Sequence, residues 1–339
     1  MVKVTNINGI AKLAGVSTAT VSRVMNNKSI VHEDTRRKIL QIARDMNYRP
    51  GLAGGKKDGG IRTIGLIMPS NISDFFYGIE NEIKRMKHRL LFSTYHGSEE
   101  SLRDIMEYME SLCVDGIILM VPQAEINVRD LLSDTLVPVV TFSTPSGIGC
   151  CTSIRIDNAQ GAYVAVEHLI KNHRHKKIAM IKGPGRNIDS EERLQGFMDA
   201  HGKNGIPVKS NFIVEGDFTY QSGFYAFSRL VSLPERPDAV FAANDVMAAG
   251  AYEAAKARGL VIGRDIAIVG FDDIQLSGLI KPSLTTVHVH FNELGVKALS
   301  HLVNIIEGRT DRNEMHDERI SSGLIIRESC GCKVENRIL

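Results

Sequence analysis

From Thr63 onward, short apolar runs alternate with longer stretches in which apolar residues recur every three or four positions. The short runs have the length and composition of buried strands, which we expect at residues 63–68, 90–95, 116–121, 137–142, 177–181, 239–242 and 266–269. Amphipathic stretches such as 159–171 and 246–258 separate them. This alternation predicts βαβ units, parallel sheets and helices on both sheet faces, and its length favours two lobes.

The chain before residue 50 has a different pattern, typical of short helices. Apolar residues recur at intervals of three and four at Ile7, Ile10, Ala11 and Ala14. They predict a helix that begins after Thr5 or Asn6 as its N-cap and stops at Gly15. A second helix is expected after Ser17, and a third at about 33–46, so that the three helices share one small core.

The spacing of three residues in this region is typical of a helix-turn-helix. Ala11 is small where two helices would cross closely, and Gly15 can adopt the positive φ of a tight turn. Val21 is β-branched and would pack back between the helices. Burial of Val21 and Val24 would leave Thr18, Ala19, Ser22 and Arg23 facing outward.

Charge is distributed unevenly along the chain. Residues 1–60 contain 11 Lys and Arg against 4 Asp and Glu, a net charge of +7, whereas residues 61–339 contain 30 against 35, a net charge of −5. A basic head on a mildly acidic body is typical of a nucleic-acid-binding module attached to a domain with another task.

Several function classes lack their signals in the sequence. No apolar run approaches a membrane span and the N-terminus has no secretory signal, so we expect a cytoplasmic protein. No dinucleotide fingerprint, P-loop or catalytic spacing appears, so neither enzymatic activity nor a cofactor is expected. The five cysteines are expected to be reduced thiols. Because Cys330 and Cys332 have no evident ligand partners nearby in the sequence, no metal site is predicted.

The N-terminal region resembles the lactose-galactose repressor (LacI/GalR) family of bacterial transcriptional regulators. The matching motifs are Ile10-Ala-Lys-Leu-Ala-Gly-Val-Ser17, Thr20-Val-Ser-Arg-Val24, Asn26 and Asn47-Tyr-Arg-Pro50. In that family the second helix enters the major groove, so the resemblance implies base contacts from Thr18, Ala19 and Arg23. It places Thr5, Ser17, Thr20 and Asn26 nearer the phosphates. Arg23 can donate two hydrogen bonds to guanine, and the Thr18 and Ala19 methyl groups suit thymine methyls.

Residues 50–60 form a glycine-rich linker that departs from the family pattern. In the family, this hinge becomes a short helix whose leucine enters the minor groove. Here Gly51, Gly54 and Gly55 disfavour a helix, and Lys57 stands where the leucine is expected. Leu52 is the large apolar side chain left for that role, and Lys56 and Lys57 are expected to contact the minor groove. We therefore hypothesise a weakly helical hinge that bends DNA modestly.

The resemblance also covers the body. Its motifs are Asp157-Asn158, Gly196-Phe197, Gly216-Asp-Phe218, Ala243-Asn-Asp245, Gly270-Phe-Asp-Asp273 and Leu284-Thr-Thr-Val287. They imply an all-α helix-turn-helix head and an α/β periplasmic-binding-protein-like body of two doubly wound parallel-sheet lobes. The expected domains are the head at 1–49, the hinge at 50–60, the ligand-binding and dimerisation domain at 61–330, and a tail at 331–339. Lobe one is expected at about 61–160 and 291–318, and lobe two at about 161–290 and 319–330.

Polar residues follow several expected strands and predict an effector site. Ligands of open α/β sheets bind beyond the carboxyl ends of the strands, where Asn71, Ser143, Asn244 and Asp272 lie. By resemblance, Phe75, Phe76 and Phe218 line the apolar face of a ligand ring. Polar contacts are implied for Asn187, Asp189, Arg193, Asn244 and Asp272. In an alternative interpretation, Asp245 or Asp272 only caps the helix that follows.

These observations predict a DNA-binding transcriptional regulator whose operator affinity is controlled by a small effector bound between two lobes. A repressor is expected from family frequency, with palindromic double-stranded operator DNA and a second copy of the chain as partners. A sugar or sugar derivative is the expected effector. A sugar phosphate, a nucleobase and a protein corepressor stay open. The alternative function is a two-lobed sugar-binding protein or sugar-processing enzyme that does not bind an operator.

Overall fold

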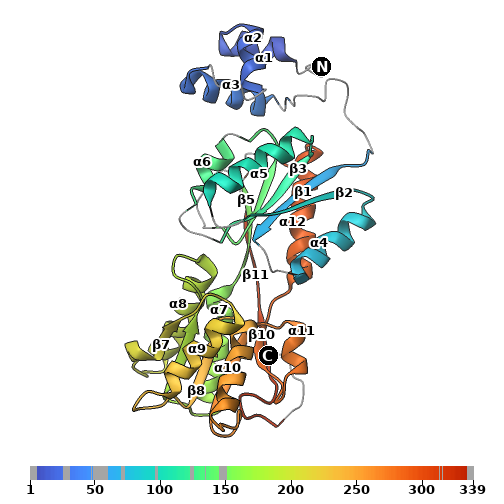
Figure 1. Ribbon diagram of the computed structural model, residues 1–339. Coiled ribbons are helices and arrows are strands. Elements are labelled where there is room, and N and C mark those ends of the chain that lie inside the picture. Colours follow the sequence, from blue (N-terminus) through green and yellow to red (C-terminus); the bar gives the residue numbers. More distant parts are fainter. Residues whose placement is uncertain are drawn as a thin grey trace. The chain divides into compact units, whose positions relative to one another are not determined.

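A computed structural model describes most of the chain. The described residues are 6–25, 31–46, 48, 60–69, 73–95, 98–122, 126–133, 135–144, 151–312, 314 and 316–333, without the side chains of residues 44, 73–75, 77 and 133. They form three head helices and two α/β lobes, each built around one sheet (Figure 1). Among the described residues, no helix is both long and apolar enough to cross a membrane.

The head contains the three helices predicted from the sequence. They are α1 (Ile7–Ala14), α2 (Thr18–Met25) and α3 (Glu33–Asp45). The side chain of Asn6 accepts a hydrogen bond from the backbone N–H of Gly9 at 2.9 Å and so caps α1. Gly15 ends α1 with a φ of 72°, as the tight turn requires. Ile10, Val21 and Ile39 are fully buried and join the three helices in one core.

The first lobe is built on a six-stranded sheet of order β11-β5-β4-β3-β1-β2. Its strands are β1 (Thr63–Pro69), β2 (Arg89–Tyr95), β3 (Gly116–Met120), β4 (Val139–Phe142), β5 (Thr152–Ile156) and β11 (Asp317–Ile320). Strands β1 to β5 pair in parallel. The helices are α4 (Ser73–Arg85), α5 (Glu99–Ser111), α6 (Val128–Ser133) and α12 (Phe291–Ile306).

The second lobe repeats this architecture with strand order β12-β10-β9-β8-β6-β7. Its strands are β6 (Ile178–Lys182), β7 (Ile213–Glu215), β8 (Ala239–Ala242), β9 (Ala267–Asp272), β10 (Thr285–His288) and β12 (Gly323–Ile325). All its strand pairs are parallel except β10 with β12. The helices are α7 (Asn158–Lys171), α8 (Ile188–Lys203), η1 (Ser210–Phe212), α9 (Tyr220–Val231), α10 (Asp245–Ala257) and α11 (Gln275–Leu279).

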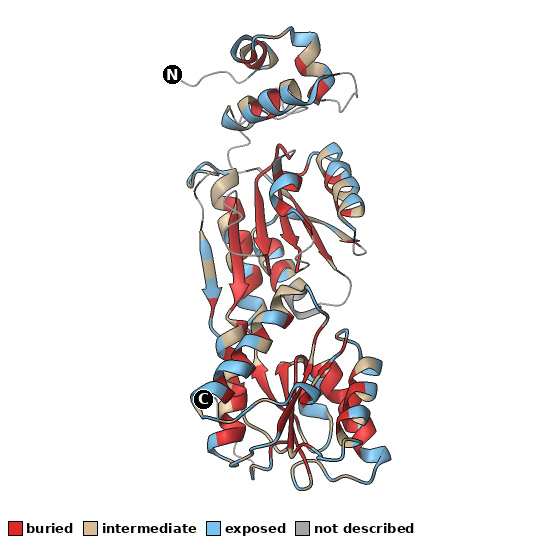
Figure 2. Ribbon diagram, turned by 90° about the vertical axis from the view of Figure 1, so that its left-hand side faces the viewer, coloured by how far each residue is buried: buried red, intermediate tan, exposed pale blue. Residues whose placement is uncertain are grey.

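The central strands of both sheets are buried along their length (Figure 2). Strands covered by helices on both faces read as continuous apolar runs, and this explains why β3, β4 and β8 could be predicted from the sequence. In the second lobe, α7 packs on α8 and α9 packs on α10. The α7–α8 contact is so close that a side chain at Gly196 would lie 2.1 Å from the carbonyl oxygen of Ala159, which accounts for glycine in that motif.

Several short strands were not predicted from the sequence. β5, β7, β10, β11 and β12 have three to five residues each and lie at or near sheet edges, where side-chain patterns are short or partly polar. The predicted strand at 137–142 begins two residues later, at Val139, because Pro138 precedes it.

Apart from a short segment at Pro122 that also groups with the second unit, the chain passes between the two compact units three times. The passages lie between Ile154 and Arg155, between Phe291 and Asn292, and between Glu318 and Arg319. Residues 155–160, which we assigned to lobe one, therefore belong to the second unit, because the passage occurs inside β5 and not after it. The predicted tail also begins too early, since residues 331–333 continue the second unit.

Candidate functional site

The outward face of α2 carries the residues expected to contact DNA bases. Thr18, Ala19 and Arg23 are exposed, while Val21 and Val24 are buried on the opposite side. The helical repeat separates the two sets, because every third or fourth residue returns to the same face. The head therefore presents a guanidinium and two methyl-bearing side chains on one exposed helix face.

Ser17 and Thr20 fix the start of α2. The Ser17 hydroxyl oxygen accepts a hydrogen bond from the backbone N–H of Thr20 at 3.1 Å, which is the N-cap predicted for this helix. The two hydroxyl groups are also hydrogen-bonded to each other at 2.9 Å. Both side chains therefore stabilise the helix that carries Arg23, in addition to any contact with phosphates.

Some predicted site residues lie outside the described part of the chain. They are Thr5 and Asn26 in the head region, Leu52, Lys56 and Lys57 in the hinge, and Asn71 and the side chain of Phe75 in the first lobe.

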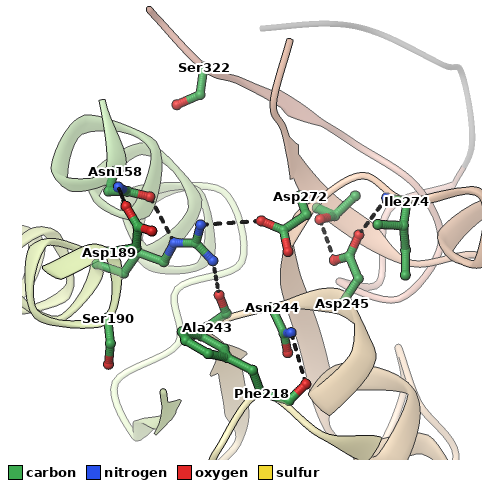
Figure 3. Close-up of polar contacts among 12 residues, drawn as sticks. Asn158, Asp189, Ser190, Phe218, Ala243, Asn244, Asp245, Asp272, Ile274 and Ser322 are labelled. Atoms are coloured by element: carbon green, nitrogen blue, oxygen red, sulfur yellow. Dashed lines mark hydrogen bonds and ion pairs between the residues drawn. The ribbon is translucent and has the colours of Figure 1, made fainter. Parts of the chain in front are cut away.

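Within the second lobe, polar side chains from four elements meet at the carboxyl ends of the strands (Figure 3). Asn158 begins α7, Asp189 and Arg193 lie in the first half of α8, Asn244 follows β8, and Asp272 ends β9. We call the set of Asn158, Asp189, Arg193, Asn244 and Asp272 the Arg193 cluster. Residues more than 80 positions apart in the sequence are thereby brought into one network.

Arg193 is the centre of this network. Its Nε donates to the Asn158 side-chain oxygen at 2.8 Å, its Nη1 donates to the Ala243 carbonyl, and its Nη2 pairs with Asp272 Oδ1 at 3.2 Å. The guanidinium lies 3.8 Å from the centre of the Phe271 ring. With 5% of its surface exposed, Arg193 is held in one orientation by partners on all its nitrogens.

Asn158 connects Arg193 to carboxylates on α8. Its amide nitrogen donates to Asp189 Oδ1 at 2.8 Å and to Glu192 Oε2 at 3.2 Å. The amide orientation is thus fixed from both ends, because its oxygen accepts from Arg193. Asn158 lies in one of the motifs of the family resemblance but was not predicted as a site residue. No local signal could identify it, since its partners are 31 or more positions away.

Several residues of the second lobe, Asp272 and Phe218 among them, have backbone conformations that side chains rarely adopt. Asp272 has a φ of 108° and Phe218 has a φ of 66°. Such conformations cost free energy and are concentrated at binding and catalytic sites. They set the direction of a carboxylate at the end of β9 and of an aromatic ring between β7 and α9. The Phe218 ring covers Gly183, where an added side chain would collide with it at 2.2 Å.

Two of the predicted asparagines, Asn187 and Asn244, also have structural roles. Asn187 caps α8 by accepting from the Ser190 N–H at 3.0 Å, and Asn244 caps α10 by accepting from the Met247 N–H at 2.9 Å. The Asn244 amide nitrogen donates to the Phe218 carbonyl at 3.1 Å. Asn244, and not Asp245, therefore caps α10.

Asp245 is fully buried beside the cluster and joins three segments of the second lobe. It accepts hydrogen bonds from the Ile274 N–H at 3.0 Å, from the Ser277 hydroxyl at 2.6 Å and from the Thr286 hydroxyl. Burial, together with the negative charge of Asp272, raises the pKa of Asp245 to about 8. Its contacts point to a structural role.

Two of the site residues predicted in the first lobe, Ser143 and Phe76, lie in the described part of the chain. Ser143 follows β4 with a φ of 51°, and its buried hydroxyl has no hydrogen-bond partner among the described residues. The half-buried Phe76 ring on α4 meets the Phe92 ring edge-on, with 5.2 Å between ring centres.

In the second lobe, Ser190 on α8 also has a buried hydroxyl without a partner among the described residues, and nothing in the sequence singled it out.

Cys330 and Cys332 have no ligand partners nearby in the sequence, but the fold brings them to His168 and His173, and the four ligand atoms all lie within 4.8 Å of one another. The histidines are more than 150 positions earlier in the chain, so sequence spacing could not reveal them.

The Arg193 cluster combines a fixed cation, carboxylates and amides beside an aromatic ring. Donors and acceptors held in this way match the hydroxyl groups of a small polar molecule, and the ring can cover an apolar face. The arrangement is therefore suited to recognising a ligand.

Two family models match the chain. Residues 6–51 match the model described as bacterial regulatory proteins, lacI family, and residues 166–330 match the periplasmic binding protein-like domain.

Full-length relatives and solved structures agree with these matches. The HTH-type transcriptional repressor PurR of Photobacterium profundum is 32% identical over 95% of this chain and 98% of its own length. Catabolite control protein A of Priestia megaterium is 34% identical over 90% of this chain and 93% of its own. The transcriptional regulator CelR in complex with cellobiose has a TM-score of 0.72 at 29% identity, and covers 96% of this chain and 99% of that one. The lac repressor dimer bound to operator and an anti-inducer has a TM-score of 0.73 at 26% identity, with 97% and 99% coverage.

Proposed function

We propose, from the premise that this chain belongs to the lacI family of bacterial regulatory proteins, that its head reads the operator and its second lobe binds an effector. It is a DNA-binding transcriptional regulator of the repressor type with an effector-binding, periplasmic-binding-protein-like domain. Repressors of this family bind operator DNA as dimers and respond to small molecules. The residue roles, the effector class and a cytoplasmic location are our proposals.

The exposed face of α2 is proposed to read the operator. Arg23 would bond to a guanine edge while Thr18 and Ala19 contact thymine methyl groups. The support is that all three side chains are exposed on one short helix whose other face is core. Two heads in a dimer would read two half-sites of a palindrome. The hinge at 50–60 is proposed to bend DNA modestly, and circular permutation of the operator would contradict this if it revealed a strong bend.

The Arg193 cluster is proposed to bind a sugar or sugar derivative. The observation that carries this proposal is the buried guanidinium joined to Asn158 and Asp272, which fixes polar groups at the carboxyl ends of β8 and β9. Adjacent hydroxyl groups of a sugar can each donate to a carboxylate and accept from a guanidinium or amide. Phe218 would then lie against the ring carbons. The ligand's effect on operator affinity must equal the operator's effect on ligand affinity.

A thermal-shift screen of sugars, sugar phosphates and nucleobases on the full chain tests the effector class. A molecule that binds the folded state raises Tm, and a sugar or sugar derivative is expected to do so. Asp189→Asn should abolish the shift, because it removes a carboxylate of the cluster. Asp199→Asn is the matched control, since Asp199 is an exposed aspartate on the same helix. A shift that only nucleobases produce, or that Asp189→Asn leaves unchanged, would contradict the proposal.

Operator binding is tested by gel shift on the promoter of the neighbouring genes with the active compound added. Affinity should decrease steeply with salt because bound counterions are released, and should change when the effector is present. A chain that ignores DNA at low salt would instead support the alternative of a sugar-binding protein.

A further inference from the structure

Two histidines and two cysteines form a compact cluster at the end of α7, away from the Arg193 cluster. His168 lies in α7 and His173 in the turn after it, while Cys330 and Cys332 lie in the segment after β12. Asn158 begins the same helix ten residues before His168, about 15 Å along its axis. The two groups are therefore separate sites of one lobe.

We propose that His168, His173, Cys330 and Cys332 form a structural zinc site. Two thiol sulfurs and two imidazole nitrogens are the ligand set of closed, tetrahedral zinc sites. Zinc bonds of about 2.0–2.3 Å place tetrahedral ligand atoms roughly 3.3–3.8 Å apart. Cys332 Sγ lies 3.2 Å from His173 Nε2 and 3.9 Å from His168 Nε2, and all four ligand atoms lie within 4.8 Å of one another. Small side-chain movements would complete the geometry.

The fold holds the cysteine segment in place before any ion binds. Ser329 accepts from the Thr285 N–H at 2.8 Å and donates to the Ile268 carbonyl at 2.6 Å, so the residue before Cys330 is tied to two strands. Gly331 separates the cysteines with a φ of 94°, a conformation that turns both thiols toward the histidines and that other residues rarely adopt. The ligands are therefore preorganised by backbone contacts.

The immediate surroundings suit a bound thiolate. The Thr285 hydroxyl donates to Cys330 Sγ at 3.2 Å, a contact of the kind that supports metal ligands from the outer shell. The Nδ1 atom of His168 is buried and has no hydrogen-bond partner among the described residues, so no described group there competes with a metal ion for the imidazole.

A zinc ion at this place would join the end of α7 to the C-terminal segment, closing a loop from residue 168 to residue 332. The match to the periplasmic binding protein-like domain ends at residue 330, so Cys332 lies beyond the part that the domain model describes. The site would fix this C-terminal segment to the second lobe. It is independent of the proposed effector.

Metal analysis of the full-length protein, purified without chelators, tests the site directly. About one zinc per chain is expected, and it should be lost from Cys332→Ser and from His173→Asn. Cys113→Ser is the matched control, because Cys113 is an exposed thiol in the other lobe and should leave zinc binding unchanged. His173 and Cys332 are only partly buried, so both variants are expected to fold, as circular dichroism would verify.

Zinc titration of chelator-stripped protein against a competing dye gives the affinity. Each variant should bind zinc more than about 100-fold more weakly than the wild type, since even loss of an outer-shell partner costs up to that amount. Added zinc should raise Tm of the wild type and of Cys113→Ser only. Absorption of the cobalt-substituted protein should have tetrahedral and thiolate signatures. Equal zinc affinity in wild type and both variants, or a Cys330–Cys332 disulfide in place of metal, would overturn the proposal.

Discussion

The head and the second lobe place their candidate contact residues in opposite ways. On α2, Thr18, Ala19 and Arg23 are exposed neighbours within six residues of sequence, and their positions follow from one helix. In the second lobe, Asn158 and Asp272 are 114 positions apart and meet through the buried Arg193. The head therefore presents side chains that can be changed without loss of fold, whereas the cluster contributes to the stability of the lobe that contains it.

The largest effect in this comparison is expected from Arg193→Ala. The substitution removes the guanidinium that pairs with Asp272 and bonds to the Asn158 oxygen in a largely buried place, and should lower the free energy of unfolding by about 3–5 kcal/mol. Urea denaturation measures the change. Arg264→Ala is the control, because the Arg264 guanidinium of the same lobe is exposed and its pair with the half-buried Asp265 should contribute less than about 1 kcal/mol. Similar losses in both variants would remove the contrast between a buried and an exposed pair.

Arg23→Ala should do the reverse of Arg193→Ala: it should weaken DNA binding and leave the stability of the protein unchanged. Operator binding should weaken by about 1–3 kcal/mol, with stability and most non-specific affinity unchanged, because an exposed guanidinium is lost from a folded head. Fluorescence anisotropy on operator and on random DNA measures both affinities. Arg37→Ala is a control on α3, where Arg37 is exposed and pairs with Glu33 at 3.3 Å. Equal losses on the two DNA molecules would refute a base-reading role.

Stability of the second lobe should also depend on pH through Asp245. Its pKa is raised from 3.8 to about 8 when folded, so between about pH 4 and pH 8 the folded protein keeps a proton that the unfolded chain releases. The free energy of unfolding should therefore fall as pH rises through this window, by at most about 1.4 kcal/mol per pH unit.

Urea denaturation at several pH values measures this slope, and Asp245→Asn should flatten it. Asp199→Asn should leave it unchanged, since Asp199 is exposed. Stability that increases with pH in the wild type but not in Asp245→Asn would mean that the folded carboxylate is ionised, contrary to this expectation.

The smallest effect is expected from Ser17→Ala in the head. Loss of the N-cap should destabilise α2 by about 1 kcal/mol, because the Thr20 N–H loses its side-chain partner. Hydrogen exchange of α2 amides in the full chain measures the change. Thr18→Ala, one position inside the helix, should have less effect on exchange. If both variants exchange alike, the capping contact is not what stabilises the helix start.

The sequence by itself determined the head helices and the longer strands of the two sheets. Helix starts at Asn6 and Ser17, the turn at Gly15 and the runs that became β3 and β8 all depend on neighbours within a few positions, where local geometry dictates the outcome. Only the tertiary structure decided that Asn158 joins Arg193 to Asp189, or that Cys332 meets His173. Such contacts join distant positions, and neither periodicity nor spacing carries information about which buried polar groups will find one another.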